Sequence, residues 1–89
     1  MRVEPRPSEV RRLVIRVFAI LGTAPAHLFD LEEEILIDAG RYLGRSYRAD
    51  DLMAMWLADI GLVQFYDEEG NMLRTVNLLE EAVGQRVAA

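Results

Sequence analysis

The hydrophobic residues near the start of the chain recur at the spacing of one helical face. After Pro5 and Pro7, Ser8 is a natural N-cap residue, because its hydroxyl can accept a hydrogen bond from a free backbone N–H. The apolar positions that follow are three and four residues apart, and Gly22 ends the pattern. They are Val10, Leu13, Val14, Val17, Phe18 and Leu21. This pattern predicts a first helix over residues 8–21.

Two later stretches of the chain also have helical spacing. A second helix is expected to begin at Asp30, whose carboxylate can cap it while Glu33 completes a capping-box-like pair. Its apolar positions, stopped by Gly44, are Leu31, Ile35, Leu36, Ala39, Tyr42 and Leu43. A third helix is expected over residues 49–60, closed by Gly61. Its apolar residues are Leu52, Met53, Met55, Trp56, Leu57 and Ile60.

The spacing changes after the third helix. Residues 62–66 and 72–77 are rich in β-branched and aromatic residues, and residues 67–71 between them have the composition of a hairpin loop. We therefore expect a two-stranded antiparallel ribbon, followed by a short closing helix over residues 78–83. The expected fold class is mainly α with a small β-hairpin, that is, a three-helix core plus a two-stranded wing.

Length and composition indicate one domain. The chain has 89 residues, of which 52% are hydrophobic, which suffices for one core over residues 1–89. Residues 1–7 and 84–89 are expected to be flexible. The start of the chain lacks the apolar stretch of a signal peptide, no apolar run nears the length of a membrane span, and there is no cysteine. These features predict a cytoplasmic protein that does not bind membranes.

The expected order of elements resembles the winged helix-turn-helix superfamily over residues 8–77. In prokaryotic winged-helix regulators the third helix often ends in leucine, about three residues, then glycine, leucine and valine. Here that phrase is Leu57-Ala-Asp-Ile-Gly61-Leu-Val63. The acidic loop with Gly70 and the segment Leu73-Arg74-Thr75 look like a wing tip and its return strand. The resemblance implies a regulatory protein that binds DNA through its third helix.

The third helix departs from that pattern, because it offers no Arg, Lys, Asn, Gln, Ser or Thr to base edges. We expect one of its sides to form an exposed apolar patch that binds protein, since Met adapts its shape and Trp is a common hot spot. The candidate protein-interface residues are Leu52, Met55, Trp56 and Asp59. The alternative is that the apolar members of this set belong to the core.

The arginines supply the candidate nucleic-acid site. All ten basic residues are arginine, yet the net charge is −5 and the charges alternate in blocks along the chain. The residues that could converge into a phosphate-binding strip are Arg11, Arg12, Arg16, Arg45, Arg48 and Arg74. The alternative is a solvated surface on which these arginines pair with the abundant acids.

The sequence contains no catalytic, cofactor or metal motif. His27 is the only histidine, the acids of residues 30–38 are explained by helix capping, and residues 67–71 lack the alternating oxygen ligands of a calcium loop. We therefore expect a non-enzymatic module without cofactor or small-molecule substrate, which binds protein through the third helix. The partner is expected to be a second copy or a DNA-associated regulatory complex. The alternative function is a DNA-binding transcriptional regulator.

Overall fold

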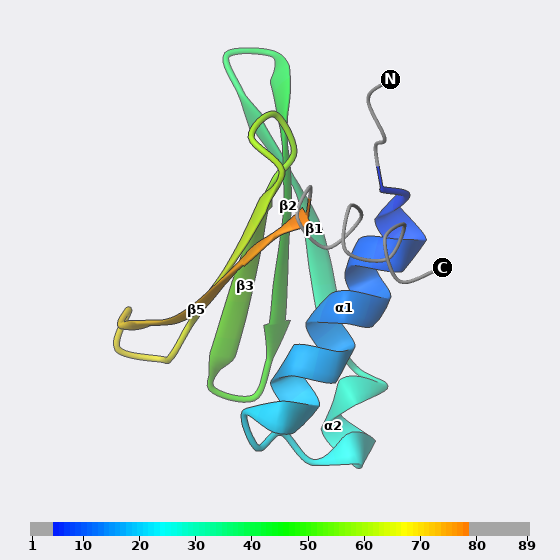
Figure 1. The fold of residues 1–89 in the computed structure, drawn as a ribbon, viewed down its shortest axis with the longest axis vertical. Coiled ribbons are helices and arrows are strands. Elements are labelled where there is room, and N and C mark those ends of the chain that lie inside the picture. The colour runs from blue at the N-terminus through cyan, green and yellow to red at the C-terminus, as the bar shows by residue number, and fades with distance from the viewer. Residues whose placement is uncertain (1–4, 79–89) are drawn as a thin grey trace.

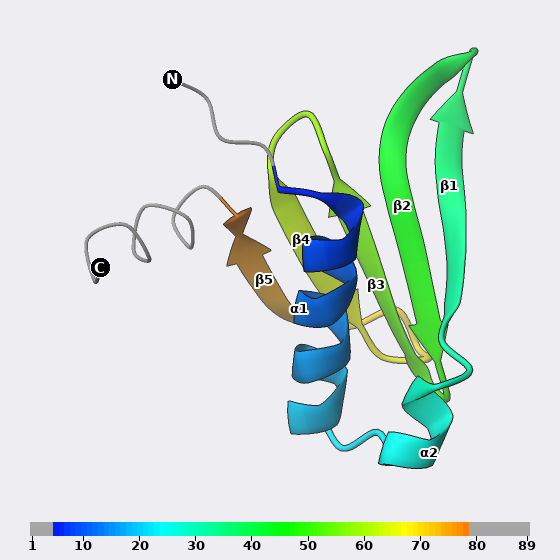
Figure 2. The ribbon, with the colours of Figure 1, turned by 90° about the vertical axis from the view of Figure 1, so that its right-hand side faces the viewer.

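Five consecutive antiparallel strands follow two helices in the computed structural model, which describes residues 5–78 (Figure 1). The elements are α1 (Pro7–Ile20), α2 (Pro25–Leu28), β1 (Glu32–Asp38), β2 (Arg41–Ala49), β3 (Leu52–Leu57), β4 (Leu62–Tyr66) and β5 (Met72–Asn77). Each strand pairs with the next one along the chain, so the order across the sheet is β1-β2-β3-β4-β5. Figure 2 shows α1 lying along one face of this sheet.

The first predicted helix and the predicted hairpin are confirmed. Helix α1 begins at Pro7, and Gly22, with a φ of 111°, ends it as predicted. The prediction of Ser8 as the N-cap is wrong, because the N-cap position is Arg6 and Pro7 occupies the first turn. Strands β4 and β5 pair antiparallel around the acidic loop of residues 67–71.

The second and third predicted helices are wrong. Residues 32–38 and 41–49 form the β1–β2 hairpin, and residues 52–57 form strand β3. The mainly α fold class is therefore wrong, because the described chain is one antiparallel sheet with two helices. The resemblance to winged helix-turn-helix proteins is wrong for the same reason, since that architecture requires a three-helix core.

Strand β3 shows why the helical interpretation failed. Its residues alternate between buried and half-buried, so Leu52, Ala54 and Trp56 face α1 while the residues between them face away. A segment that is apolar at nearly every position fits a strand with two apolar faces as well as it fits a helix. The spacing of its apolar residues alone does not distinguish the two structures. The turn between β1 and β2, at Ala39 and Gly40 with φ values of 51° and 77°, is a two-residue hairpin connection. It lacks the Asn-Gly or Asp-Gly pair that usually marks one in a sequence.

The core lies between α1 and the sheet. The helix contributes Val10, Leu13, Val14, Val17 and Phe18, all buried. The sheet contributes Tyr47, Ala49, Leu52, Ala54, Trp56, Val63, Phe65 and Val76 from four strands, with Leu31 and Leu78 at its margins. The rings of Phe18 and Phe65 pack edge to face with centroids 5.8 Å apart. The predicted closing helix lies outside the described residues apart from Leu78, and so do the predictions for residues 1–4 and 84–89.

Gly44 lies where β2 passes very close to β3. The register of β1 and β2 shifts at Leu36/Ile37, next to this glycine, whose φ is 152°. A Cβ added at Gly44 would lie 1.8 Å from the carbonyl oxygen of Trp56, which no side-chain rearrangement can relieve. The position therefore requires glycine, and this glycine sits inside a strand and does not stop a helix.

We expect Gly44→Ala to lower the free energy of unfolding by about 3 kcal/mol or more, because the new methyl group must displace backbone atoms. Gly40→Ala is the matched control, since Gly40 also has a positive φ but nothing lies within 4 Å of its would-be Cβ. That control should lower the free energy of unfolding by about 1 to 2 kcal/mol, which is the energy an alanine loses in the left-handed conformation. Urea unfolding of both variants measures the difference, and equal losses would contradict the close approach.

Candidate functional site

The face of the sheet turned away from α1 is the main candidate surface. No helix or strand of residues 5–78 covers it (Figure 2). We call it the open face. At its centre lie six half-buried residues from two neighbouring inner strands, β3 and β4. They are Met53, Met55 and Leu57 of β3 and Leu62, Gln64 and Tyr66 of β4.

The strand register sets these side chains opposite one another in three neighbouring cross-strand pairs. Met53 lies opposite Tyr66, and Leu57 lies opposite Leu62. Met55 lies between these two pairs, so Met53, Met55 and Leu57 run in line along β3. We call these three side chains the apolar row. Antiparallel sheets with one solvated face usually carry polar side chains there. An apolar centre is therefore the unusual feature of the open face.

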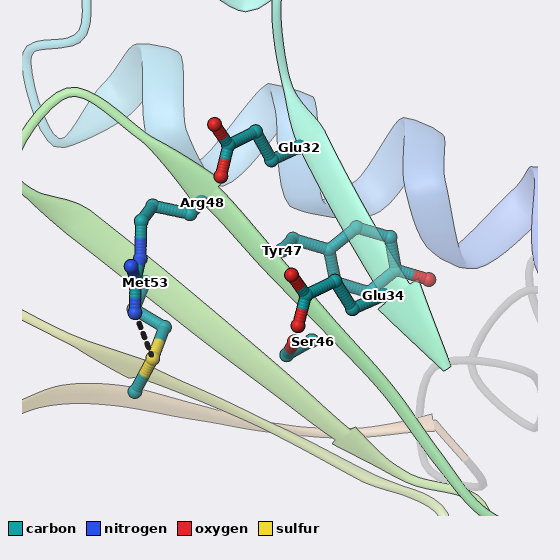
Figure 3. A pocket seen from close by; sticks show the side chains of 6 residues that line it. All are labelled: Glu32, Glu34, Ser46, Tyr47, Arg48 and Met53. Atoms are coloured by element: carbon teal, nitrogen blue, oxygen red, sulfur yellow. Dashed lines mark hydrogen bonds between the residues drawn. The ribbon is translucent and has the colours of Figure 1, made fainter. Parts of the chain in front are cut away.

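The side of the open face formed by β1 and β2 is charged. Glu32 and Glu34 of β1 lie opposite Arg48 and Ser46 of β2. Together with Met53 and Tyr47 these residues line a hollow of about 50 Å³ (Figure 3). The guanidinium of Arg48 extends toward Met53, whose sulfur accepts from Nη2 at 3.8 Å. The hollow is far smaller than the several hundred Å³ of a typical small-molecule site.

The structure separates the four residues of the predicted protein interface. Leu52 and Trp56 are 7% and 6% exposed and belong to the core beneath α1. Met55, although next to Trp56 in sequence, lies on the open face. Asp59 is exposed in the turn between β3 and β4, where its carboxylate lies 3.9 Å from Arg41. The four residues share a strand and a turn instead of one helix face.

The six arginines of the predicted nucleic-acid site do not form one strip. Arg11 and Arg45 both bind Glu33 under the first turns of α1. The other four are exposed at three separate places. Arg12 and Arg16 are on the outer side of α1, Arg48 is on the open face, and Arg74 is on the edge strand β5.

Glu33 is the centre of the strongest charge cluster on the helix side of the sheet. Its Oε1 accepts a 2.7 Å hydrogen bond from Nη1 of Arg11, and its Oε2 accepts one from Arg45. Partial burial opposes ionisation of Glu33, but the hydrogen bonds and charges of the two arginines outweigh it, so the pKa of Glu33 is lowered. The adjacent Tyr47 is fully buried, and this burial raises the pKa of its phenol. The cluster ties α1 to β1 and β2.

His27 forms a hydrogen-bonded pair with Asp50. It lies in α2, and its Nδ1 is 2.6 Å from the carboxylate of Asp50 in the β2–β3 turn. The hydrogen bond to Asp50, and then the negative charge of Asp50, raise the pKa of His27. Both side chains border a shallow hollow of about 240 Å³ that Arg48 also lines. Among residues 5–78, no three His, Cys, Asp or Glu side chains are grouped so that they could hold a metal ion.

The helices described between residues 5 and 78 are too short, or not apolar enough, to cross a bilayer.

We expect Glu33→Gln to lower the free energy of unfolding at neutral pH by about 1 to 2 kcal/mol, because two partly buried arginines lose their carboxylate. The pKa of Glu33 is lower in the folded chain than its ordinary 4.5, so its contribution is complete above that value. It is lost as the pH falls through the folded pKa. The variant should therefore show a flatter pH dependence of stability below about pH 5.

Urea unfolding at neutral pH and at about pH 3.5 measures this effect. Glu9→Gln is the control, since Glu9 makes only an exposed contact of 3.9 Å with Arg6 and should change stability by less than about 0.5 kcal/mol. Identical pH profiles for wild type and Glu33→Gln would show that the cluster does not stabilise the fold.

Of the open-face residues, the sequence pointed to Met55 as a protein-interface residue and to Arg48 as a nucleic-acid-binding residue. Once the strands are known, period-two alternation identifies the other members. The helical interpretation of residues 49–60 had instead placed Met53 and Leu57 at different angles around a helix axis from Met55. Searches of protein-family models, of curated proteins and of solved structures found no match to this chain.

Proposed function

We propose that this chain is a non-enzymatic domain that binds another protein through the open face. The observation that carries the proposal is the row of Met53, Met55 and Leu57 on a sheet face that no described element covers. These side chains are half-buried and adjacent, and a contiguous apolar surface within reach of solvent typically marks a protein interface. Methionine suits such a surface because its flexible, polarisable side chain adapts to the shape of the partner. The proposed interface therefore lies on the sheet and not on the third helix that the sequence predicted.

The form of the open face favours a macromolecular partner over a small molecule. The hollows that border it measure about 50 and 240 Å³ and are lined mostly by charged and polar groups. Small-molecule sites are typically deeper and mainly apolar. By contrast, a broad surface with an apolar centre and a charged margin has the anatomy of a protein–protein interface.

The positions of the arginines favour protein over nucleic acid as the partner. Binding to phosphates needs several cations on one surface, because each neutralised phosphate adds to the affinity. Here Arg11 and Arg45 both pair with Glu33, which offsets one of their two charges, and the remaining candidates lie at three separate places. The net charge of −5 opposes approach to a polyanion as well. The DNA-binding alternative has no comparable support.

Site-directed photo-crosslinking tests this proposal, because the chain has no cysteine and a single introduced thiol can be labelled alone. Met55→Cys carries a benzophenone label on the open face, and Arg12→Cys carries the same label on the exposed side of α1. We expect irradiation in an extract of the source cells to give a discrete protein adduct from the first variant, at least about fivefold more than from the second. Excess unlabelled wild-type chain should compete the adduct away.

Circular dichroism of both labelled variants confirms that the fold is retained before irradiation. Equal adduct yields from the two positions, or no adduct from Met55→Cys, would refute the assignment of the open face as the binding surface.

A further inference from the structure

The charged side chains of the open face lie on β1 and β2. Glu32 and Glu34 of β1 project onto this face, and neither forms an ion pair with another of the residues 5–78. The guanidinium of Arg48, on β2 between β1 and β3, extends away from Glu32 toward Met53 (Figure 3). Two exposed carboxylates on β1 therefore lie to one side of the apolar residues of β3, and one guanidinium on β2 lies between them and Met53.

The spacing of these features fits a helix laid along β3. Met53 and Leu57 are four residues apart in a strand, which corresponds to about 13 Å, the length of about nine helical residues. Strands β1 and β3 are two strand spacings apart, or about 10 Å, which is close to the diameter of a helix. A helix resting its apolar stripe on β3 would thus extend one polar flank over Arg48 and Ser46 of β2 to Glu32 and Glu34, which outnumber the single guanidinium.

We infer that the occupant of the open face is a cationic amphipathic helix of the partner protein. This inference rests on the proposed function and adds the chemistry of the partner. Lysines or arginines on one flank of such a helix would complement Glu32 and Glu34, and its apolar stripe would pack on the methionines. A second copy of the chain fits less well, because it brings the same carboxylates and another net charge of −5 to the contact.

The probe for this inference is a fluorescein-labelled peptide of about 18 residues, with leucines spaced three and four apart and lysines between them. One control peptide replaces every lysine by glutamate, and a second has the composition of the first in shuffled order. We expect fluorescence anisotropy to show the cationic helix binding at least about tenfold more tightly than either control. Its affinity should fall between about 50 mM and about 300 mM NaCl, because the exposed charges are screened.

Two double variants with the same change in net charge locate the contact. Glu32→Gln with Glu34→Gln should weaken binding of the cationic peptide about three- to tenfold. Glu68→Gln with Glu69→Gln, in the exposed β4–β5 loop, should leave it unchanged. Met55→Gln should also weaken binding, about fivefold, because it removes part of the apolar row.

The outcomes separate this inference from the proposed function. If Met55→Cys still yields a protein adduct but the cationic and acidic peptides bind equally, only the inference is overturned. If the two double variants weaken binding equally, the attraction is general electrostatics and the inference is likewise overturned. A photo-adduct consisting of two copies of this chain would make a second copy the occupant. Absence of any adduct from Met55→Cys would overturn the proposed function itself.

Discussion

The packing of α1 against one face of the sheet is the contact on which the rest of the structure depends. Val10, Val14 and Phe18 of the helix are almost completely buried, and they meet a sheet surface formed by Tyr47 and Phe65 among others. Burying a large apolar side chain contributes about 1.5 to 3 kcal/mol, so this one interface supplies most of the hydrophobic stabilisation available to so short a chain. Because α1 covers one face, the opposite face of the same strands is left open by the elements described within residues 5–78.

The parts of the fold that the sequence predicts correctly are those with one dominant local signal. Helix α1 combines three-and-four spacing with a terminal Gly22, and strands β4 and β5 flank an acidic loop with a glycine. The β1–β2 hairpin was not predicted, because the local signals in its sequence favour a helix. Glu33 has the spacing of a capping residue but serves instead as the acceptor for two arginines distant in sequence. Such long-range pairing leaves no periodic trace in the sequence.

The candidate site was only partly predictable for a related reason. In a helix, Leu52, Met55 and Trp56 lie on one side, whereas in strand β3 Met55 points away from its two neighbours in the set. Assuming the period of a helix instead of that of a strand therefore placed core residues and surface residues in the same predicted interface. The arginines show the same limit, since their clustering along the chain says nothing about which of them reach Glu33. Only the strand register decides which side chains share a face.

The burial of Trp56 under α1 tests this account most directly, and the indole is the only tryptophan of the chain. Steady-state fluorescence with iodide as quencher measures its exposure without any substitution. The account predicts a blue-shifted emission in the native protein, with quenching at least about fivefold weaker than in urea. A native emission maximum and a quenching constant equal to those of the unfolded chain would place the ring in solvent and contradict the assignment of the two faces.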